Sequence, residues 1–226
     1  MLRSGSVAVV ATLLVASACG SSSNTETGAK APATATAAHE TRTVPSGWVT
    51  YNDETAGFEI SYPDSWVELE PGLHRDALES MFEGSVDFAA TTGVFGAGLE
   101  RPEGGGFNPN VAVTVEPVAS DLTLDEYDAA ATRAIEQLFD NWETTSKSKI
   151  QLGDREALMS RSSVPLSEFD PSVADESRVW LVQLSALSES LSWEVSCSTV
   201  ALTESAAQDS TSTCEEVLRT FVLYAP

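Results

Sequence analysis

The sequence predicts an α+β domain over residues 47–226, in which a largely antiparallel β-sheet carries helices packed on it. Three observations predict this class. Apolar and polar residues alternate in several short segments, most clearly at Leu191–Cys197, as they do in half-buried strands. Neighbouring strand segments are mostly joined by short turns, which favours antiparallel pairing. One longer segment, residues 124–139, instead repeats its apolar residues at helical spacing.

The first part of the domain predicts a hairpin and then a glycine-rich segment. Gly57–Tyr62 alternates, Pro63-Asp64 supplies a turn and Trp66–Glu70 alternates again, so these two strands are expected to pair. A short helix is expected over residues 73–82. Residues 85–107 predict a weak strand followed by a mobile loop, because glycine is frequent there and no phosphate-binding pattern follows it.

The helix at residues 124–139 is the best-defined element. Thr123 and Glu126 form a capping box at its start. Its expected buried positions are Leu124, Tyr127, Ala131, Ile135, Leu138 and Phe139. Further strands are expected at Val111–Val115, Lys149–Leu152, Glu156–Arg161 and Val179–Leu187, with a tight turn at Gly153-Asp154.

The N-terminus predicts a lipoprotein signal peptide over residues 1–18. Arg3 precedes the apolar run Val7–Val15, which is too short to span a bilayer as an anchor. The residues Ala16–Cys19 resemble a bacterial lipobox, and this resemblance implies that Cys19 receives a diacylglycerol and becomes the first residue after cleavage. Two acyl chains, for example of palmitate, give stable anchoring to a membrane. Ala16 stands where leucine is usual, so ordinary cleavage after Ala18 is the alternative.

Residues 19–46 predict a lipidated N-terminus followed by a disordered linker. They consist largely of Ser, Thr, Ala and Pro, and such a composition buries too little apolar surface to offset the entropy of ordering. The chain has three cysteines, and an exported protein favours disulfides. A Cys197–Cys214 disulfide would leave Cys19 for acylation, whereas the alternative is two free buried thiols. Thr213 and Glu216 form a second capping box, which predicts a short helix with Cys214 in its first turn.

The charge of the chain limits its partners. It has 34 acidic and 12 basic residues and a net charge of −22, so its surface repels nucleic acid and anionic lipid head groups. We expect no catalytic residue, no metal site and no cofactor, because only two histidines are present and the common catalytic motifs are missing. The alternative is a glycoside hydrolase that uses a pair of carboxyl groups. The other interpretation of the acidic residues is that they form a solvated loop. The carboxylates considered for that role are Glu168, Asp170, Asp175 and Glu176.

Three stretches carry a resemblance to a known family. "YNDETAGFEISYPDSW" resembles the opening of PsbP-like domains. "GFNPNVAVTVEPV", and "WEVSCSTV" followed by "CEEVLRTF", resemble segments of exported actinobacterial lipoproteins of the LpqN/LpqT type, which share that fold. The resemblance covers Val49–Phe221. It implies an antiparallel sheet sandwiched by helices, no enzymatic activity, and a role with cell-envelope lipids or protein partners.

We therefore expect a non-enzymatic, extracytoplasmic lipoprotein that is anchored by its N-terminal lipid to the outer face of the cell membrane. It would bind an apolar or amphiphilic ligand or dock on an envelope protein. The residues proposed to line a ligand pocket are Val94, Phe95, Leu99 and Phe107, because they lie in an apolar stretch loosened by glycine. The alternatives are an acid-rich extracytoplasmic hydrolase and a passive surface scaffold.

Overall fold

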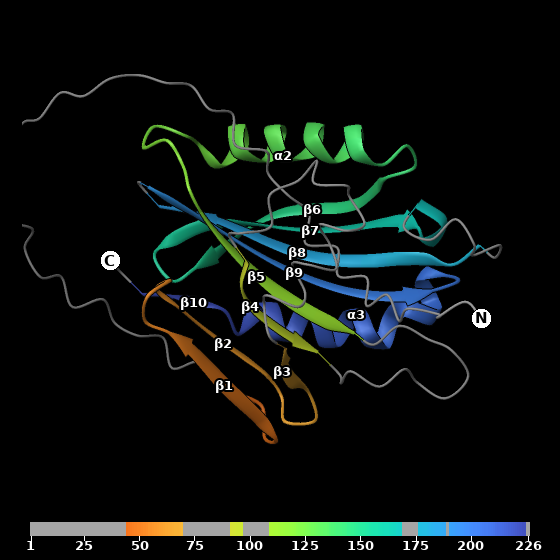
Figure 1. The fold of residues 1–226 in the computed structure, drawn as a ribbon, viewed down its shortest axis with the longest axis horizontal. Coiled ribbons are helices and arrows are strands. Elements are labelled where there is room, and N and C mark those ends of the chain that lie inside the picture. Colours follow the sequence, from red (N-terminus) through yellow and green to blue (C-terminus); the bar gives the residue numbers. More distant parts are fainter. Residues whose placement is uncertain (1–43, 70–90, 97–108, 169–175, 189, 225–226) are drawn as a thin grey trace, which may run out of the picture.

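The computed structural model describes residues 44–69, 91–96, 109–168, 176–188 and 190–224 (Figure 1). The described chain forms two β-sheets, two α-helices and a short 3-10 helix. The small sheet has the order β1-β2-β10, with bounds Trp48–Asp53, Phe58–Pro63 and Val222–Leu223. The helices are α2 (Leu124–Leu138), α3 (Glu204–Arg219) and η1 (Leu166–Glu168).

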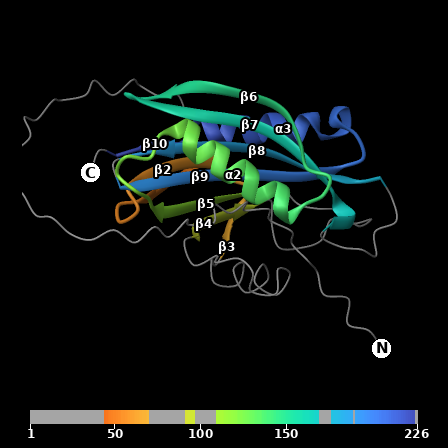
Figure 2. The same cartoon turned by 90° about the horizontal axis from the view of Figure 1, so that it is seen from above.

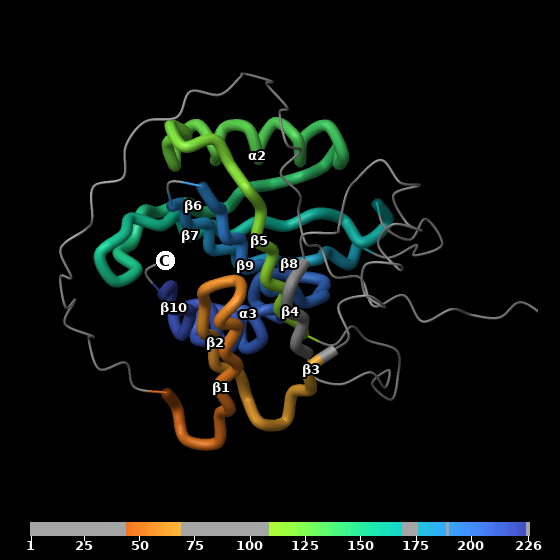
Figure 3. Tube along the Cα trace, turned by 60° about the vertical axis from the view of Figure 1, so that its left-hand side comes forward, coloured from red at the N-terminus to blue at the C-terminus, as the bar shows by residue number. Residues whose placement is uncertain are grey.

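The large sheet has the order β3-β4-β5-β9-β8-β7-β6, and every neighbouring pair is antiparallel. Its strands are β3 (Val67–Leu69), β4 (Thr91–Gly96), β5 (Asn110–Pro117), β6 (Glu143–Leu152), β7 (Arg155–Pro165), β8 (Arg178–Leu187) and β9 (Leu191–Ala201). Helix α2 lies on one side of this sheet, and α3 with the small sheet lies on the other (Figures 1 and 3). The predicted α+β class, with an antiparallel sheet between helices, is confirmed.

The main core fills the space between the large sheet, α3 and the small sheet. Val113, Val195 and Leu184 lie opposite one another on β5, β9 and β8, and all three are fully buried. The rings of Phe58 and Phe221 pack against each other, with 5.5 Å between their centroids. Burying apolar surface in this way is the main source of folding free energy.

A disulfide joins Cys197 on β9 to Cys214 on α3, with 2.07 Å between the sulfurs and 5.5 Å between the Cα atoms. Both cysteines are fully buried in the main core. The bond therefore fixes α3 to a central strand from inside the core. This is the pairing that the three-cysteine pattern led us to expect.

The predicted hairpin of Gly57–Tyr62 with Trp66–Glu70 is wrong. Strand β2 pairs with β1 and β10, while β3 pairs with β4 in the other sheet. The chain turns between the two sheets, where the Trp66 N–H donates to the Pro63 carbonyl at 2.9 Å. Strand β2 pairs with β1 on one edge and with β10 on the other. The pairing with β10 joins distant parts of the chain, so a local sequence pattern does not predict it.

The expected short helix with Cys214 in its first turn is also wrong. Helix α3 begins ten residues earlier, at Glu204, and Thr203 is its N-cap, accepting from the Ala206 N–H at 3.2 Å. Thr213 lies inside the helix, where its hydroxyl donates to the Asp209 carbonyl at 3.2 Å. A threonine inside a helix can make this bond in place of a capping bond, so a Thr-x-x-Glu pattern alone does not locate a helix start.

Helix α2 begins where the sequence predicts. Thr123 accepts from the Glu126 N–H at 3.3 Å, and the Thr123 N–H donates to the Glu126 carboxylate at 3.0 Å, so both bonds of the capping box are present. The helix ends at Leu138, one residue before its predicted end. Neither described α-helix combines the length and the apolar composition that a membrane-spanning helix needs.

The N-terminal predictions, including Cys19, the signal peptide and the linker up to residue 43, lie outside the described residues. So do the helix expected at 73–82 and the loop expected after β4.

Candidate functional site

Buried polar side chains lie on the side of the large sheet that faces α2. Along β9, Trp193, Val195 and Cys197 belong to the main core on the α3 side. Because side chains alternate along a strand, Glu194 lies on the opposite side, toward α2. We call Glu194, its hydrogen-bond partners Gln183 and Tyr127, and the neighbouring Thr114, Glu116 and Ser192 the α2 polar cluster. Its members come from β9, β8, α2 and β5.

Glu194 is the centre of the α2 polar cluster. Only 6% of its surface is exposed. One carboxyl oxygen accepts from Gln183 Nε2 at 3.0 Å, and the other is 3.5 Å from the hydroxyl of Tyr127. Burial raises the pKa of Glu194 from 4.5 to about 8, and the hydrogen bonds from Gln183 and Tyr127 only partly oppose this effect. Glu194 therefore keeps its proton at neutral pH.

Tyr127 is the member of the α2 polar cluster that lies on α2. The ring is 2% exposed, and its burial raises the pKa of the phenol well above 10, with the Glu194 carboxyl as the next cause. The phenol therefore remains protonated and can donate a hydrogen bond toward the sheet. A buried tyrosine hydroxyl usually finds a hydrogen-bond partner, and here the partner is a buried acid.

Two more polar positions lie on β5, next to Glu194. The strand register places Thr114 opposite Glu194 and Glu116 opposite Ser192. Among the described residues, Thr114 Oγ1 is a buried polar atom without a hydrogen-bond partner. Glu116 is diagonal to Glu194 on the same side of the sheet, and its negative charge further raises the pKa of Glu194. The cluster thus holds two carboxyl groups on adjacent strands.

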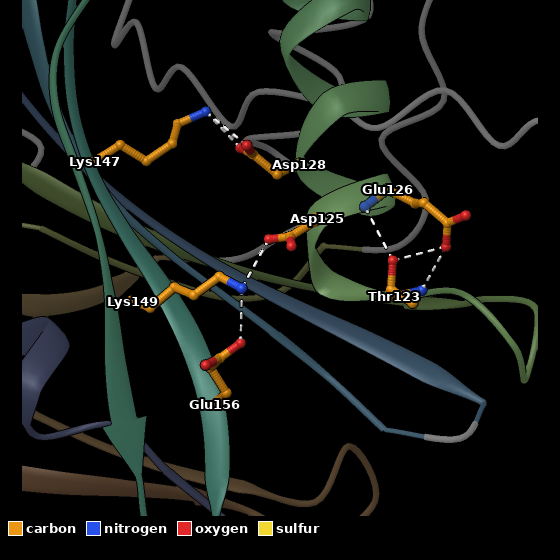
Figure 4. Close-up of polar contacts among 7 residues, drawn as sticks. All are labelled: Thr123, Asp125, Glu126, Asp128, Lys147, Lys149 and Glu156. Atoms are coloured by element: carbon orange, nitrogen blue, oxygen red, sulfur yellow. Dashed lines mark hydrogen bonds and ion pairs between the residues drawn. The ribbon is translucent and has the colours of Figure 1, made fainter.

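Lysines of β6 tie α2 to the edge of the sheet, as Figure 4 shows. Lys147 Nζ lies 2.6 and 2.8 Å from the two carboxylate oxygens of Asp128. Lys149 Nζ lies 2.9 Å from Asp125 and 3.0 Å from Glu156, whose hydrogen bonds raise the pKa of the lysine. These pairs are at least partly exposed, so water screens their attraction and they mainly fix where α2 lies.

The C-terminal half of α2 is held by apolar packing instead. Ile135, and Phe139 just after the helix, contact the buried residues Val164, Val179 and Leu181 of β7 and β8. Seen from above, α2 runs over the strands of the large sheet (Figure 2). One half of the helix therefore lies on an apolar surface and the other half over the α2 polar cluster.

The structure places some of the predicted ligand residues. Val94 and Phe95 lie in β4, where their partners in the register are Ala112 and Val111 of β5. Leu99 and Phe107 lie outside the described residues, so the pocket stays a prediction. Of the acidic loop, Glu168 ends η1 and accepts from the side-chain amide of Asn141 at 2.8 Å, and Asp170 and Asp175 are outside the described residues. Glu176 is exposed.

The α2 polar cluster is the feature that the sequence did not predict. The alternating polar residues of β9 suggested a solvated side, yet Ser192, Glu194, Ser196 and Ser198 are all buried. The sequence holds no local signal for this cluster, because the burial of Glu194 depends on β9 lying between β5 and β8 and on the contact with Tyr127 of α2. In the described part of the chain, no three metal-ligating side chains come together.

No protein-family model matches the sequence, and no curated protein does. Solved structures do match. Cyanobacterial PsbP (CyanoP) from Synechocystis sp. PCC 6803 matches with a TM-score of 0.53 and 17% identity, over 80% of this chain and 95% of that chain. The chain has a PsbP-like fold.

Two further structures match this PsbP-like fold less well. LpqN, involved in cell envelope biogenesis of Mycobacterium tuberculosis, has a TM-score of 0.49 and 11% identity, over 79% of this chain and 91% of that one. The Saccharomyces cerevisiae Ran-binding protein Mog1p has a TM-score of 0.48 and 13% identity, over 78% and 95%. At these identities the likeness concerns the fold alone.

Proposed function

We propose that this protein is a non-enzymatic docking protein of the cell envelope, which recognises another envelope protein through its outer surface. It is exported and anchored by a lipid on Cys19 to the outer face of the cell membrane. The resemblance of Ala16–Cys19 to a lipobox supports the anchor, and the PsbP-like fold agrees with the family resemblance that implies an accessory role.

The packing of the interior favours docking through the surface over binding of an internal ligand. On the α3 side of the large sheet, core positions are filled by the chain's own large side chains, including Phe58, Leu184 and Phe221, each at most 1% exposed. On the α2 side, Glu194 and its partners present polar groups, which an apolar ligand does not satisfy. A partner is therefore expected to meet the exterior of the domain.

The described surface offers few places for apolar contact. Among the described residues, the large hydrophobic side chains that are exposed are Val49, Val67 and Leu202, at 41%, 45% and 58%. Isolated apolar residues are common on surfaces, but interface centres need apolar anchors, so these are the positions to probe first.

Site-specific photo-crosslinking in intact cells tests this proposal. A photoreactive amino acid is placed at Val49, Val67 or Leu202, and at the exposed polar positions Glu136 and Ser148 as matched controls. We expect a discrete crosslinked protein from at least one apolar position and none from the controls. Equal crosslinking at all five positions, or none at any, contradicts docking through the described apolar positions.

One observation favours the hydrolase alternative. Glu116 and Glu194 lie diagonally on adjacent strands, about 7 Å apart by ordinary sheet geometry, and one of them has a raised pKa, as the general acid of a glycosidase does. Against it, Glu194 is buried and both of its oxygens are occupied. Hydrolysis of a chromogenic glycoside by the wild type, lost in both Glu116→Gln and Glu194→Gln, would establish this alternative.

A further inference from the structure

Two arginines share one carboxylate where α3 faces β7. Arg161 of β7 donates through Nη2 to one oxygen of Glu215 on α3, and Arg219 donates through Nη2 to the other oxygen at 3.4 Å. We call these three side chains the two-arginine cluster. The shared carboxylate holds the two guanidinium groups side by side, although like charges repel each other. The cluster has two positive charges and one negative charge.

The other ion pairs of the described residues have no such excess of positive charge. Lys149 lies between the carboxylates of Asp125 and Glu156, and Lys147 is bound by both oxygens of Asp128. Such pairing is expected in a chain with a net charge of −22. In the part of the chain that the structure describes, the two-arginine cluster is the ion-pair group in which cations outnumber carboxylates.

The arginine side chains of this cluster are exposed and have unused hydrogen-bond donors. A guanidinium group has five N–H donors, and the contacts of each arginine side chain with described residues use only its Nη2. The side chains of Arg161 and Arg219 are 46% and 65% exposed, whereas that of Glu215 is 13% exposed. The counter-ion is therefore sheltered, while the remaining donors of two neighbouring guanidinium groups are accessible to a ligand.

We propose that the two-arginine cluster is a binding site for a phosphate-type oxyanion carried by a partner molecule. Guanidinium groups bind phosphate oxygens through paired, charge-assisted hydrogen bonds, and two adjacent groups can engage one tetrahedral anion together. Glu215 holds both side chains near each other before the anion binds, which lowers the conformational entropy lost on binding.

The acidic surroundings make this site selective. The field of the whole chain repels anions, so a monovalent anion that makes one contact gains little at the cluster. A compact group with several oxygens recovers this cost by accepting from Arg161 and Arg219 at once. The phosphate can belong to a soluble phosphate ester or to a lipid head group, because both present the same oxygens. The site stands apart from the proposed docking function, since it rests on different residues.

Nuclear magnetic resonance of the exported chain, residues 19–226, tests the site. Sodium phosphate is titrated at constant ionic strength against sodium chloride, and the arginine side-chain Nε–Hε signals are followed. We expect saturable shifts at Arg161 and Arg219 that chloride does not produce. Arg133, an exposed arginine of α2 whose Nε donates to the Ala129 carbonyl, serves as the internal control and should not shift.

Matched variants separate this site from general electrostatics. The double variant Arg161→Gln/Arg219→Gln should weaken phosphate binding by about tenfold or more, whereas Arg133→Gln removes a surface arginine and should leave it unchanged. Arg161→Lys/Arg219→Lys keeps both charges and should still weaken binding, because lysine lacks the planar fork. Circular dichroism confirms that each variant is folded.

Two ligands then identify the source of the phosphate. Glycerol phosphate represents a soluble ester, and phosphatidylcholine vesicles with or without phosphatidic acid represent a lipid surface. Binding of either ligand that depends on Arg161 and Arg219 supports the site and names its source. The proposal is overturned if phosphate causes no saturable shift beyond that of chloride, or if Arg161→Gln/Arg219→Gln binds phosphate as the wild type does.

Discussion

Replacing Glu194 by glutamine should make this protein more stable in alkaline solution. Glutamine has the shape of a protonated glutamate, and it keeps an acceptor for Gln183 and a polar group near Tyr127. It removes only the ability to become charged. The variant therefore isolates the free energy of ionising a buried carboxyl group from the free energy of packing.

The pKa of Glu194 gives the size and the sign of the effect. A rise from 4.5 in the unfolded chain to about 8 in the folded protein corresponds to about 5 kcal/mol, at about 1.4 kcal/mol per pKa unit. The folded state holds the proton more tightly, so this contribution is fully present below pH 4.5 and is lost as the pH rises through about 8. Relaxation of the site reduces the figure, and we expect about 2–5 kcal/mol.

Urea unfolding of the exported chain at acidic and alkaline pH measures the effect. Glu194→Gln and the wild type should differ little near the unfolded-state pKa of 4.5, and the variant should be the more stable protein above pH 8. The exposed substitution Glu136→Gln is the matched control, because it removes the same charge without burial. If the stability difference between Glu194→Gln and the wild type is the same at both pH values, Glu194 is not a buried, protonated acid.

Three further predictions concern the anchor and the fold. Cys19→Ala should move the protein from the membrane fraction to the soluble fraction without changing the unfolding free energy of the domain; retention in the membrane refutes the anchor. Cys197→Ala/Cys214→Ala should lower that free energy by about 3 kcal/mol for a sequence separation of 17, and free thiols in the wild type would contradict the disulfide. Thr123→Ala should cost about 1 kcal/mol through loss of the α2 capping box, whereas Thr213→Ala, inside α3, should cost less; equal costs would show that capping is not the cause.

The elements with strong local signals could be predicted from the sequence. The start of α2 depends on the capping box at Thr123, and the hairpin of β6 and β7 depends on Gly153, whose positive φ of 64° suits a tight turn. These features involve residues near each other in the chain. The pairing of β2 with β10 and the position of β3 depend on distant segments, so the local alternation at Trp66–Glu70 led to the wrong partner.

The candidate site was harder to predict for a related reason. Alternation along β9 assigned Glu194 to the side away from Trp193, which is correct, but it does not say what covers that side. Helix α2 covers it, and Tyr127 supplies a partner from 67 residues away. The two-arginine cluster likewise joins residues 54 apart, Arg161 and Glu215. Both groups require knowledge of which elements meet.

Native mass spectrometry of the protein purified from its own membrane distinguishes docking through the surface from binding of an internal ligand. From the variant Arg161→Gln/Arg219→Gln, which lacks the proposed phosphate site, we expect the mass of the acylated chain from Cys19 with no apolar or amphiphilic molecule retained, because the described interior is filled by residues such as Phe58 and Leu184. A retained molecule of that kind, released on unfolding and at one copy per chain, would contradict surface docking and favour the ligand pocket predicted at Val94, Phe95, Leu99 and Phe107.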